Sequence, residues 1–340
     1  MESFKMRQLY LSMLFPLIAL VMPCSALLSQ DEELPSNKQT PPQPPYQLPW
    51  LTGPIVCPSA HVVPYGHINY EPYFNANVIT GAYNGHWKPQ SKKNFYNMNV
   101  QGLIQFGIAP RLDFTMVPQF SWNHTDGASH WVGNDLPLGL DFQIYSDTPG
   151  TWAPAVKLGL KATVPIGRYQ KFDPNDKGTD DGGSGSWNPA AGLVFGHLFH
   201  FTGVHFLASR LAFFYTIPNS VHVKGLNNYG GGRHTYGRVY PGQTFFSDLG
   251  LEYTLAQKWA LALDIVYTHT THTRFKGRKG KTDGVPNSIG APSNEEFSLA
   301  PAIEYNWNEN CGVIAGVFFS VAGRNTAEFI NGVIAVNIYR

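Results

Sequence analysis

The densest group of potential metal ligands lies in one acidic stretch near the middle of the chain. It contains Asp173, Asn175, Asp176, Asp180 and Asp181. Oxygen ligands at alternating positions suit Ca²⁺. A lysine nevertheless stands among them, and no downstream glutamate completes a known calcium-binding loop. We predict a solvated loop without metal, and a calcium site is the alternative interpretation.

The 12 histidines suggest metal or catalytic chemistry, but their spacing argues against it. His197 and His200 are separated by three positions in an expected strand, so their side chains should point to opposite faces. The same parity separates His269 from His272. We predict interface or loop positions for both pairs and no shared metal ion.

Ser209 and His205 are the nearest approach to the Ser–His pair of a hydrolase. They share one expected strand, and a spacing of four places them about 13 Å apart. The sequence also lacks a Gly-x-Ser-x-Gly elbow at a strand-to-helix turn. We therefore predict that the protein is not an enzyme and uses no cofactor.

The composition excludes several classes of protein. Charged residues make up 14% of the 340 residues and aromatic residues another 14%, whereas an average soluble domain is about 25% charged. The net charge is +1, and no basic block is dense enough for a nucleic-acid footprint. The most basic stretch, Arg274 to Lys281, is interpreted as a solvated loop tip.

The N-terminus has the features of a secretory signal peptide over residues 1–26. Lys5 and Arg7 precede an apolar run from Leu9 to Met22, and small residues follow. That run is too short for a comfortable membrane-spanning helix. Lipidation at Cys24 is the alternative, with a poor signal before it. We assign residues 27–60, rich in proline, to a periplasmic N-terminal segment, and residues 61–340 to the folded domain.

Alternation of apolar and polar residues dominates that domain. In a strand, neighbouring side chains point to opposite faces, so each alternating segment has one apolar and one polar face. The pattern predicts an all-β fold of about 12 antiparallel strands, near residues 66–78, 94–108, 112–124, 135–146, 154–167, 188–201, 204–217, 242–255, 258–274, 295–307, 311–324 and 328–340. Boundaries from such patterns are good to two to four residues.

The connections between these strands distinguish a barrel from a soluble sandwich. Short turns at 109–111, 202–203, 256–257 and 308–310 alternate with long polar loops near 79–93, 125–134, 168–187, 218–241 and 275–294. Short periplasmic turns and longer outer loops are the rule for transmembrane β-barrels, and a sandwich has no reason to follow it. We therefore predict a transmembrane β-barrel in the outer membrane of a Gram-negative-type bacterium.

The two faces of the strands can be assigned. Candidates for the lipid side include Phe114, Phe120, Leu140, Ile265 and Ile334, with Trp122, Trp259 and Trp307 at strand ends. The candidates for lining the lumen are the polar residues on the opposite faces, namely Asp113, Gln119, Asp141, Gln143, Lys157, Lys161, Arg210, Asp248, Glu252, Asp264 and Glu304. Opposite charges among them should pair and narrow the bore.

Cys57 and Cys311 could form a disulfide. In the expected topology Cys57 precedes the first strand and Cys311 follows a short turn, so both lie on the periplasmic side, in an oxidising compartment. A bridge would tie the N-terminal segment to the base of the barrel. The alternative is two unpaired thiols whose sulfurs lie too far apart.

Three short motifs resemble the outer-membrane transporter family named for the meta-cleavage pathway of phenol degradation. They are Gly133-Asn134-Asp135 at a strand start, Pro165-Ile166-Gly167 at a strand end, and Gly183-Ser184-Gly185-Ser186 at a loop end. The chain departs from that family where Asn134 separates Gly133 from Asp135. It also ends Tyr339-Arg340 and not on an aromatic residue. The resemblance spans about residues 60–340 and implies passage of small aromatic or hydrophobic compounds.

The sequence therefore predicts an outer-membrane channel or transporter for passive or facilitated diffusion of small solutes. The expected partners are outer-membrane lipid and lipopolysaccharide, the solute, and the barrel-assembly machinery, with no nucleic acid. The alternative is a plugged structural barrel whose surface loops, 218–241 and 275–294, mediate adhesion or interaction.

Overall fold

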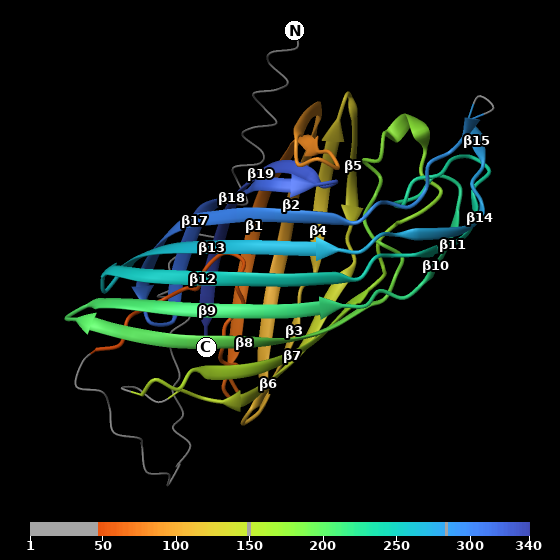
Figure 1. Cartoon of the computed structure of the whole chain (residues 1–340). Helices are drawn as coiled ribbons and strands as arrows, with labels where there is room; N and C mark the ends of the chain where they lie inside the picture. The colour runs from red at the N-terminus through yellow and green to blue at the C-terminus, as the bar shows by residue number, and fades with distance from the viewer. Residues whose placement is uncertain (1–46, 148–150, 283–284) are drawn as a thin grey trace. The chain divides into compact units, whose positions relative to one another are not determined.

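The computed structural model describes residues 47–147, 151–282 and 285–340, and the described chain forms a closed antiparallel β-barrel (Figure 1). The predicted signal peptide and most of the proline-rich segment lie outside the described residues. The predicted fold class, an all-β barrel of 12 strands, is confirmed. Among the described residues, no helix is long and apolar enough to cross a membrane.

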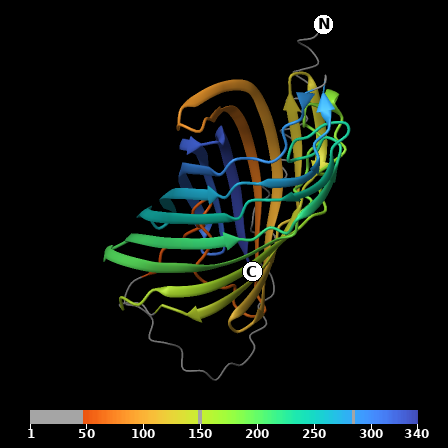
Figure 2. The same ribbon diagram turned by 45° about the vertical axis from the view of Figure 1, so that its right-hand side comes forward.

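The wall strands follow one another around the barrel in chain order (Figure 2). The barrel closes because β1 pairs with both β2 and β19. The wall consists of β1 (Ile68–Tyr83), β2 (Pro89–Ala109), β3 (Leu112–Met116) continued by β4 (Gln119–Thr125), β6 (Leu136–Tyr145), β7 (Ala155–Val164), β8 (Asn188–Thr202), β9 (His205–Thr216), β12 (Thr244–Ala256), β13 (Trp259–Thr270), β17 (Asn294–Asn308), β18 (Cys311–Arg324) and β19 (Ala327–Tyr339).

The strand expected over residues 112–124 is divided in two at Val117 and Pro118. Proline has no backbone N–H for a sheet ladder, so the strand is interrupted there. Below the break β3 pairs with β6, whereas above it β4 pairs with β5 (Ala128–Gly133). Residues 125–134, which were expected to form a loop, are therefore mostly part of the β-hairpin made by β4 and β5.

Other expected loops also contain sheet. β10 (Val221–Lys224), β11 (Tyr236–Tyr240) and β14 (Arg274–Arg278) form a three-stranded antiparallel sheet, which we call the outer sheet. β15 (Lys281–Thr282) pairs with β16 (Val285–Pro286). The short helical turn η2 (Pro174–Asp176) lies in the acidic loop. The first expected loop is much shorter than predicted, because β1 and β2 continue to Tyr83 and from Pro89.

The two faces of the wall differ as the alternation predicts. Large apolar side chains are exposed on the outside, including Phe120 at 63%, Leu140 at 42%, Ile265 at 42% and Ile334 at 40%. Polar and charged residues on the inside are buried, including Asp113, Lys157 and Glu304. An apolar exterior around a polar interior suits lipid outside the barrel and is the reverse of a soluble fold.

Candidate functional site in the barrel lumen

The lumen contains a segment of the chain that precedes β1. Residues 50–63 contact inward-facing side chains of β3, β6, β12, β13 and β17. This stretch, which we call the lumen segment, includes the end of the expected N-terminal segment at 27–60 and the first residues of the expected folded domain. It has no regular secondary structure, so its backbone N–H groups need partners from elsewhere. The wall supplies them.

Three predicted lumen carboxylates accept hydrogen bonds from the backbone of the first half of the lumen segment. Glu304 accepts from the N–H of Thr52 at 2.9 Å, and Glu252 accepts from that of Gly53 at 2.9 Å. Asp264 accepts from two consecutive N–H groups, those of Val56 at 3.2 Å and Cys57 at 3.0 Å. These carboxylates are buried, and such charge-assisted bonds are stronger than neutral ones.

The second half of the lumen segment is held by β3 and β6. Asp113 accepts from the N–H of Val63 at 2.8 Å. Gln143 accepts from the N–H of Val62 at 2.9 Å and donates to the carbonyl oxygen of Ala60 at 3.0 Å. Five of the predicted lumen residues therefore act directly on this segment.

Two of the expected ion pairs are present in the wall. Lys157 Nζ lies 2.7 Å from Asp141 Oδ2, and both side chains are buried. Arg210 Nη2 lies 2.8 Å from Glu252 Oε2. Glu252 thus joins the cation of β9 to the backbone of the lumen segment, and its removal would leave Arg210 uncompensated.

Asp248 and Lys161 do not form the pairs that we expected. Asp248 is fully buried, and neither carboxylate oxygen has a hydrogen-bond partner. Lys161 is exposed within the inward-facing row of β7, with Nζ 4.0 Å from the ring centroid of Phe214. The lumen therefore keeps an accessible cation beside an aromatic ring.

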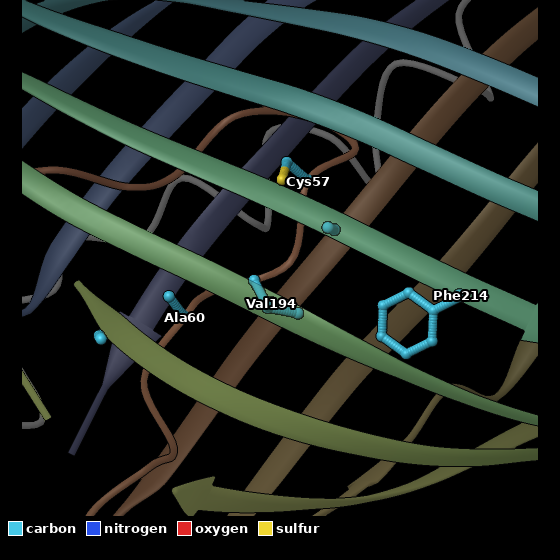
Figure 3. Packing of buried hydrophobic residues seen from close by; sticks show 6 residues of the cluster. Cys57, Ala60, Val194 and Phe214 are labelled. Carbon is cyan, nitrogen blue, oxygen red and sulfur yellow. The ribbon is translucent and has the colours of Figure 1, made fainter. Parts of the chain in front are cut away.

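A small apolar cluster anchors the middle of the lumen segment. Figure 3 shows Cys57 and Ala60 of the segment near Val194 of β8 and Phe214 of β9, all of which are buried. The close approach requires glycine in the wall, because a Cβ at Gly250 would lie 2.6 Å from that of Cys57. Apolar contact and polar contact thus hold the same stretch.

Of the two possibilities considered for Cys57 and Cys311, the disulfide is absent, and both described cysteines are buried. Cys57 packs on Gly250 of β12, and its Sγ lies 3.7 Å from the carbonyl oxygen of Asp248. Cys311 begins β18, three strands away in the sheet order. The two thiols therefore have different surroundings, and no disulfide joins them.

Sequence reasoning missed several polar residues of the lumen. Asn306 accepts from the hydroxyl of Thr52 at 3.1 Å and donates to the carbonyl oxygen of Trp50 at 3.0 Å. Glu71 accepts from Asn69, Asn337 and Tyr73. These residues alternate with apolar neighbours, which could have placed them on the inward face. Uncharged amides are also common on surfaces that face water, so the alternation did not single them out.

Gln119 lies away from the lumen segment, at the break in the wall. Its Nε2 donates to the carbonyl oxygen of Asp135 at 3.0 Å. The carboxylate of Asp135 in turn accepts from the N–H groups of Gly167 and Ser184. The three motifs behind the family resemblance therefore meet at one carboxylate.

The acidic residues of the middle loop bind separate partners and do not converge. Asp173 accepts from the N–H of Asn175, and Asp176 lies 3.6 Å from His130. Asp180 lies 3.0 Å from Arg168, and Asp181 accepts from the N–H of Gly183. Within the described ranges, no group of three His, Cys, Asp or Glu side chains could hold a metal ion.

His197 and His200 lie apart, as their parity predicts. His197 packs against Phe199 and Trp152, whereas His200 stacks on the buried ring of Phe206. His269 lies 3.4 Å from Glu295.

The candidate hydrolytic pair also has separate partners. Ser209 donates to the carbonyl oxygen of His197 at 3.5 Å. His205 contacts the carbonyl oxygen of Thr254 at 3.2 Å and the hydroxyl of Tyr253 at 3.3 Å.

Comparisons with known proteins support the fold and no closer relation. No family model matches the sequence, and no curated protein matches it. Among solved structures, the COG4313 outer membrane channel from Pseudomonas putida F1 is similar, with a TM-score of 0.63 and 13% identity over 83% of this chain and 98% of that one. The β domain of the Bordetella autotransporter BrkA matches with a TM-score of 0.45 and 10% identity, over 80% of this chain and 98% of that chain.

Proposed function

We propose that this protein is an outer-membrane channel that carries small solutes by passive or facilitated diffusion. The observation that carries the proposal is the lumen, where a short segment is attached to the wall mainly through hydrogen bonds. Each such bond to a charged group contributes about 1.5–3 kcal/mol net, because both partners can bond to water instead. Passage then requires binding and displacement, and no covalent chemistry.

The outer membrane is the location that we propose, in a Gram-negative-type bacterium. The exposed apolar side chains of the wall and the alternation of short turns with longer connections support it. The chain would be exported by the signal peptide at residues 1–26 and inserted by the barrel-assembly machinery.

Small aromatic anions are the solute class that the lumen suits best. Lys161 offers an exposed cation, and the ring of Phe214 lies 4.0 Å from its Nζ. A cation beside an aromatic face can contact both the ring and the carboxylate of one solute. This pair supports the aromatic or hydrophobic compounds expected from the family resemblance.

Single-channel recording tests the proposal. The purified, refolded protein should give discrete conductance steps in a planar bilayer, and benzoate should alter their size or frequency. Uptake of benzoate into proteoliposomes measures the same path without current. A folded, heat-modifiable barrel with neither conductance nor benzoate uptake would contradict the proposal.

The alternative of a plugged structural barrel with adhesive loops is not favoured, because the lumen segment is held by contacts that can be broken. Deletion of loop 218–241 or 275–294 distinguishes the two functions. Loss of surface adhesion with unchanged solute uptake would support the alternative.

A further inference from the structure

The outer sheet has one apolar face and one basic face. Val221, Val223 and Val239 are buried on one side, packed with Phe275 and Tyr229. Alternation places the exposed residues on the other side, including His222, Lys224, Arg238, Arg274, Lys276 and Arg278. The basic stretch interpreted from the sequence as a loop tip is therefore partly an ordered strand.

The cations of this face are aligned by the strand register. His222 pairs with Arg238, and Arg238 pairs with Lys276, so a row of basic residues crosses the sheet. Like charges directly opposite one another destabilise a strand pair. The recorded contact within the row is Arg238 Nη2 with His222 Nε2 at 2.7 Å.

The described part of the chain supplies no counter-charge to these cations. No ion pair among the described residues includes Lys224, Arg238, Arg274, Lys276 or Arg278. The sequence explains this, because residues 218–247 contain no Asp or Glu, and residues 265–294 contain one, Asp283. An anion from outside the chain would relieve the repulsion.

The basic face points away from the loops over the lumen. Tyr229, on the apolar side, donates its hydroxyl to the carbonyl oxygen of Ser184 at 2.8 Å. Ser184 Oγ accepts from Asn188, which lies on the inward-facing row of β8. The apolar face therefore packs toward the loop over the lumen, and the basic face points away from that loop.

The basic face lies close along the chain to the apolar outer surface of β9. Exposed Tyr215, in β9, and exposed Ile217, which directly follows the end of β9, are the last outward-facing apolar residues there. His222 follows Ile217 by five residues, which spans at most about 17 Å of extended chain. The basic row therefore lies within about 17 Å of the last outward-facing apolar side chains next to β9.

We propose that the basic face of the outer sheet binds the phosphorylated sugar headgroups of lipopolysaccharide in the surrounding outer leaflet. This inference rests on the outer-membrane location proposed above. Arg238 and Lys276 form the central row, with Lys224 and Arg278 beside it. Clustered Lys and Arg at a membrane surface recognise anionic headgroups through summed attraction, and Arg binds phosphate in a bidentate manner.

Binding of labelled lipopolysaccharide to the purified, refolded full chain tests the inference. The double variant Arg238→Gln/Lys276→Gln should bind about tenfold more weakly. A second variant, Lys224→Gln/Arg278→Gln, should also lose affinity. The matched control is Lys88→Gln/Lys92→Gln, which removes two exposed cations from the β1–β2 hairpin and should bind as wild type does. Heat-modifiable gel migration verifies folding of each.

The comparison ligands distinguish this partner from others. Lipopolysaccharide whose phosphates have been removed should bind weakly to every form. Equal loss in the control pair, unchanged affinity in both outer-sheet variants, or tighter binding to phosphatidylglycerol vesicles or a sulfated polysaccharide would overturn the inference. Because binding is measured without current or uptake, its failure and a failure of the channel proposal can be told apart.

Discussion

Asp135 and Ser184 are joined by two hydrogen bonds to one carboxylate oxygen. Asp135 Oδ2 accepts from the backbone N–H of Ser184 at 2.7 Å and from its hydroxyl at 2.9 Å, while Oδ1 accepts from the N–H of Gly167 at 2.9 Å. The contact is so close that a Cβ at Gly183 would lie 2.2 Å from Oδ1. This carboxylate connects the loop after β7 to the short connection between β5 and β6.

The Asp135→Asn substitution should loosen that loop. An asparagine keeps one acceptor oxygen and directs an NH₂ group at an N–H donor, so the loss should be about 1–3 kcal/mol of unfolding free energy. Faster proteolytic cleavage within residues 168–187 and a lower unfolding temperature would measure it. Asp173→Asn is the control, because Asp173 accepts mainly within its own turn. Equal effects of the two would argue against a special role for Asp135.

The Asp264→Asn substitution should release the lumen segment. Asp264 accepts from both Val56 and Cys57, and asparagine can replace only one of these bonds. A charged hydrogen bond contributes about 1.5–3 kcal/mol, so open events in single-channel records should become more frequent. Glu296→Gln is the control, because Glu296 accepts from Ser298 and Thr326 and not from the segment. Unchanged gating in Asp264→Asn would remove the segment from the conduction path.

The Lys161→Gln substitution should shift ion selectivity toward cations. Lys161 is the exposed inward-facing cation beside Phe214, and its loss leaves the lumen carboxylates in greater excess. The reversal potential in a salt gradient measures the shift, and benzoate should lose its effect on conductance. Lys93→Gln, at the outer hairpin, should leave both unchanged. A wild-type reversal potential in Lys161→Gln would place this residue outside the path.

Cys57 should be protected from thiol reagents in the folded barrel, because its side chain is buried between the lumen segment and β12. Maleimide should modify it slowly in wild type and at least about tenfold faster when Asp264→Asn frees the segment, as expected for a site that opens locally. Reducing and non-reducing gels should show one mobility for wild type and Cys57→Ser. Different mobilities would indicate the disulfide that the structure lacks.

The acidic loop should respond to pH through Asp181. Burial, with the nearby carboxylates of Asp180 and Asp135, raises the pKa of Asp181 from 3.8 to about 6. A raised pKa in the folded state adds stability that is fully present below pH 4 and is lost as pH rises through 6. Proteolysis of the loop should therefore be slower at pH 4 than at pH 7, and Asp181→Asn should flatten this difference.

Asp126, whose pKa shifts in the opposite direction, serves as the control for that pH experiment. Hydrogen bonds from Lys177 and Lys93 lower the pKa of Asp126 from 3.8 to about 2. Its contribution is present above pH 4 and is lost as pH falls toward 2. Asp126→Asn should therefore leave the difference between pH 4 and pH 7 in place. A flattened difference in this variant would contradict the assignment to Asp181.

Strand positions and facing were predictable from the sequence, because both depend on local alternation. Asp113, Asp264 and Glu304 alternate with apolar neighbours such as Phe114 and Ile265, which predicted that they point inward. The structure buries all three. Residues two apart in a strand share a face whatever surrounds them. The closed barrel follows from the count and from the order of short and long connections.

The partners of those inward side chains were decided only by the tertiary structure. Parity says that Glu252 and Asp264 point inward, but it does not say that the backbone of residues 52–57 occupies the space before them. The same limit applied to Cys57, which packs on Gly250 of β12, and to Cys311, which begins β18; no disulfide joins them. Alternation is a property of one strand, whereas contacts across a lumen depend on where a distant, irregular segment finds acceptors for its N–H groups.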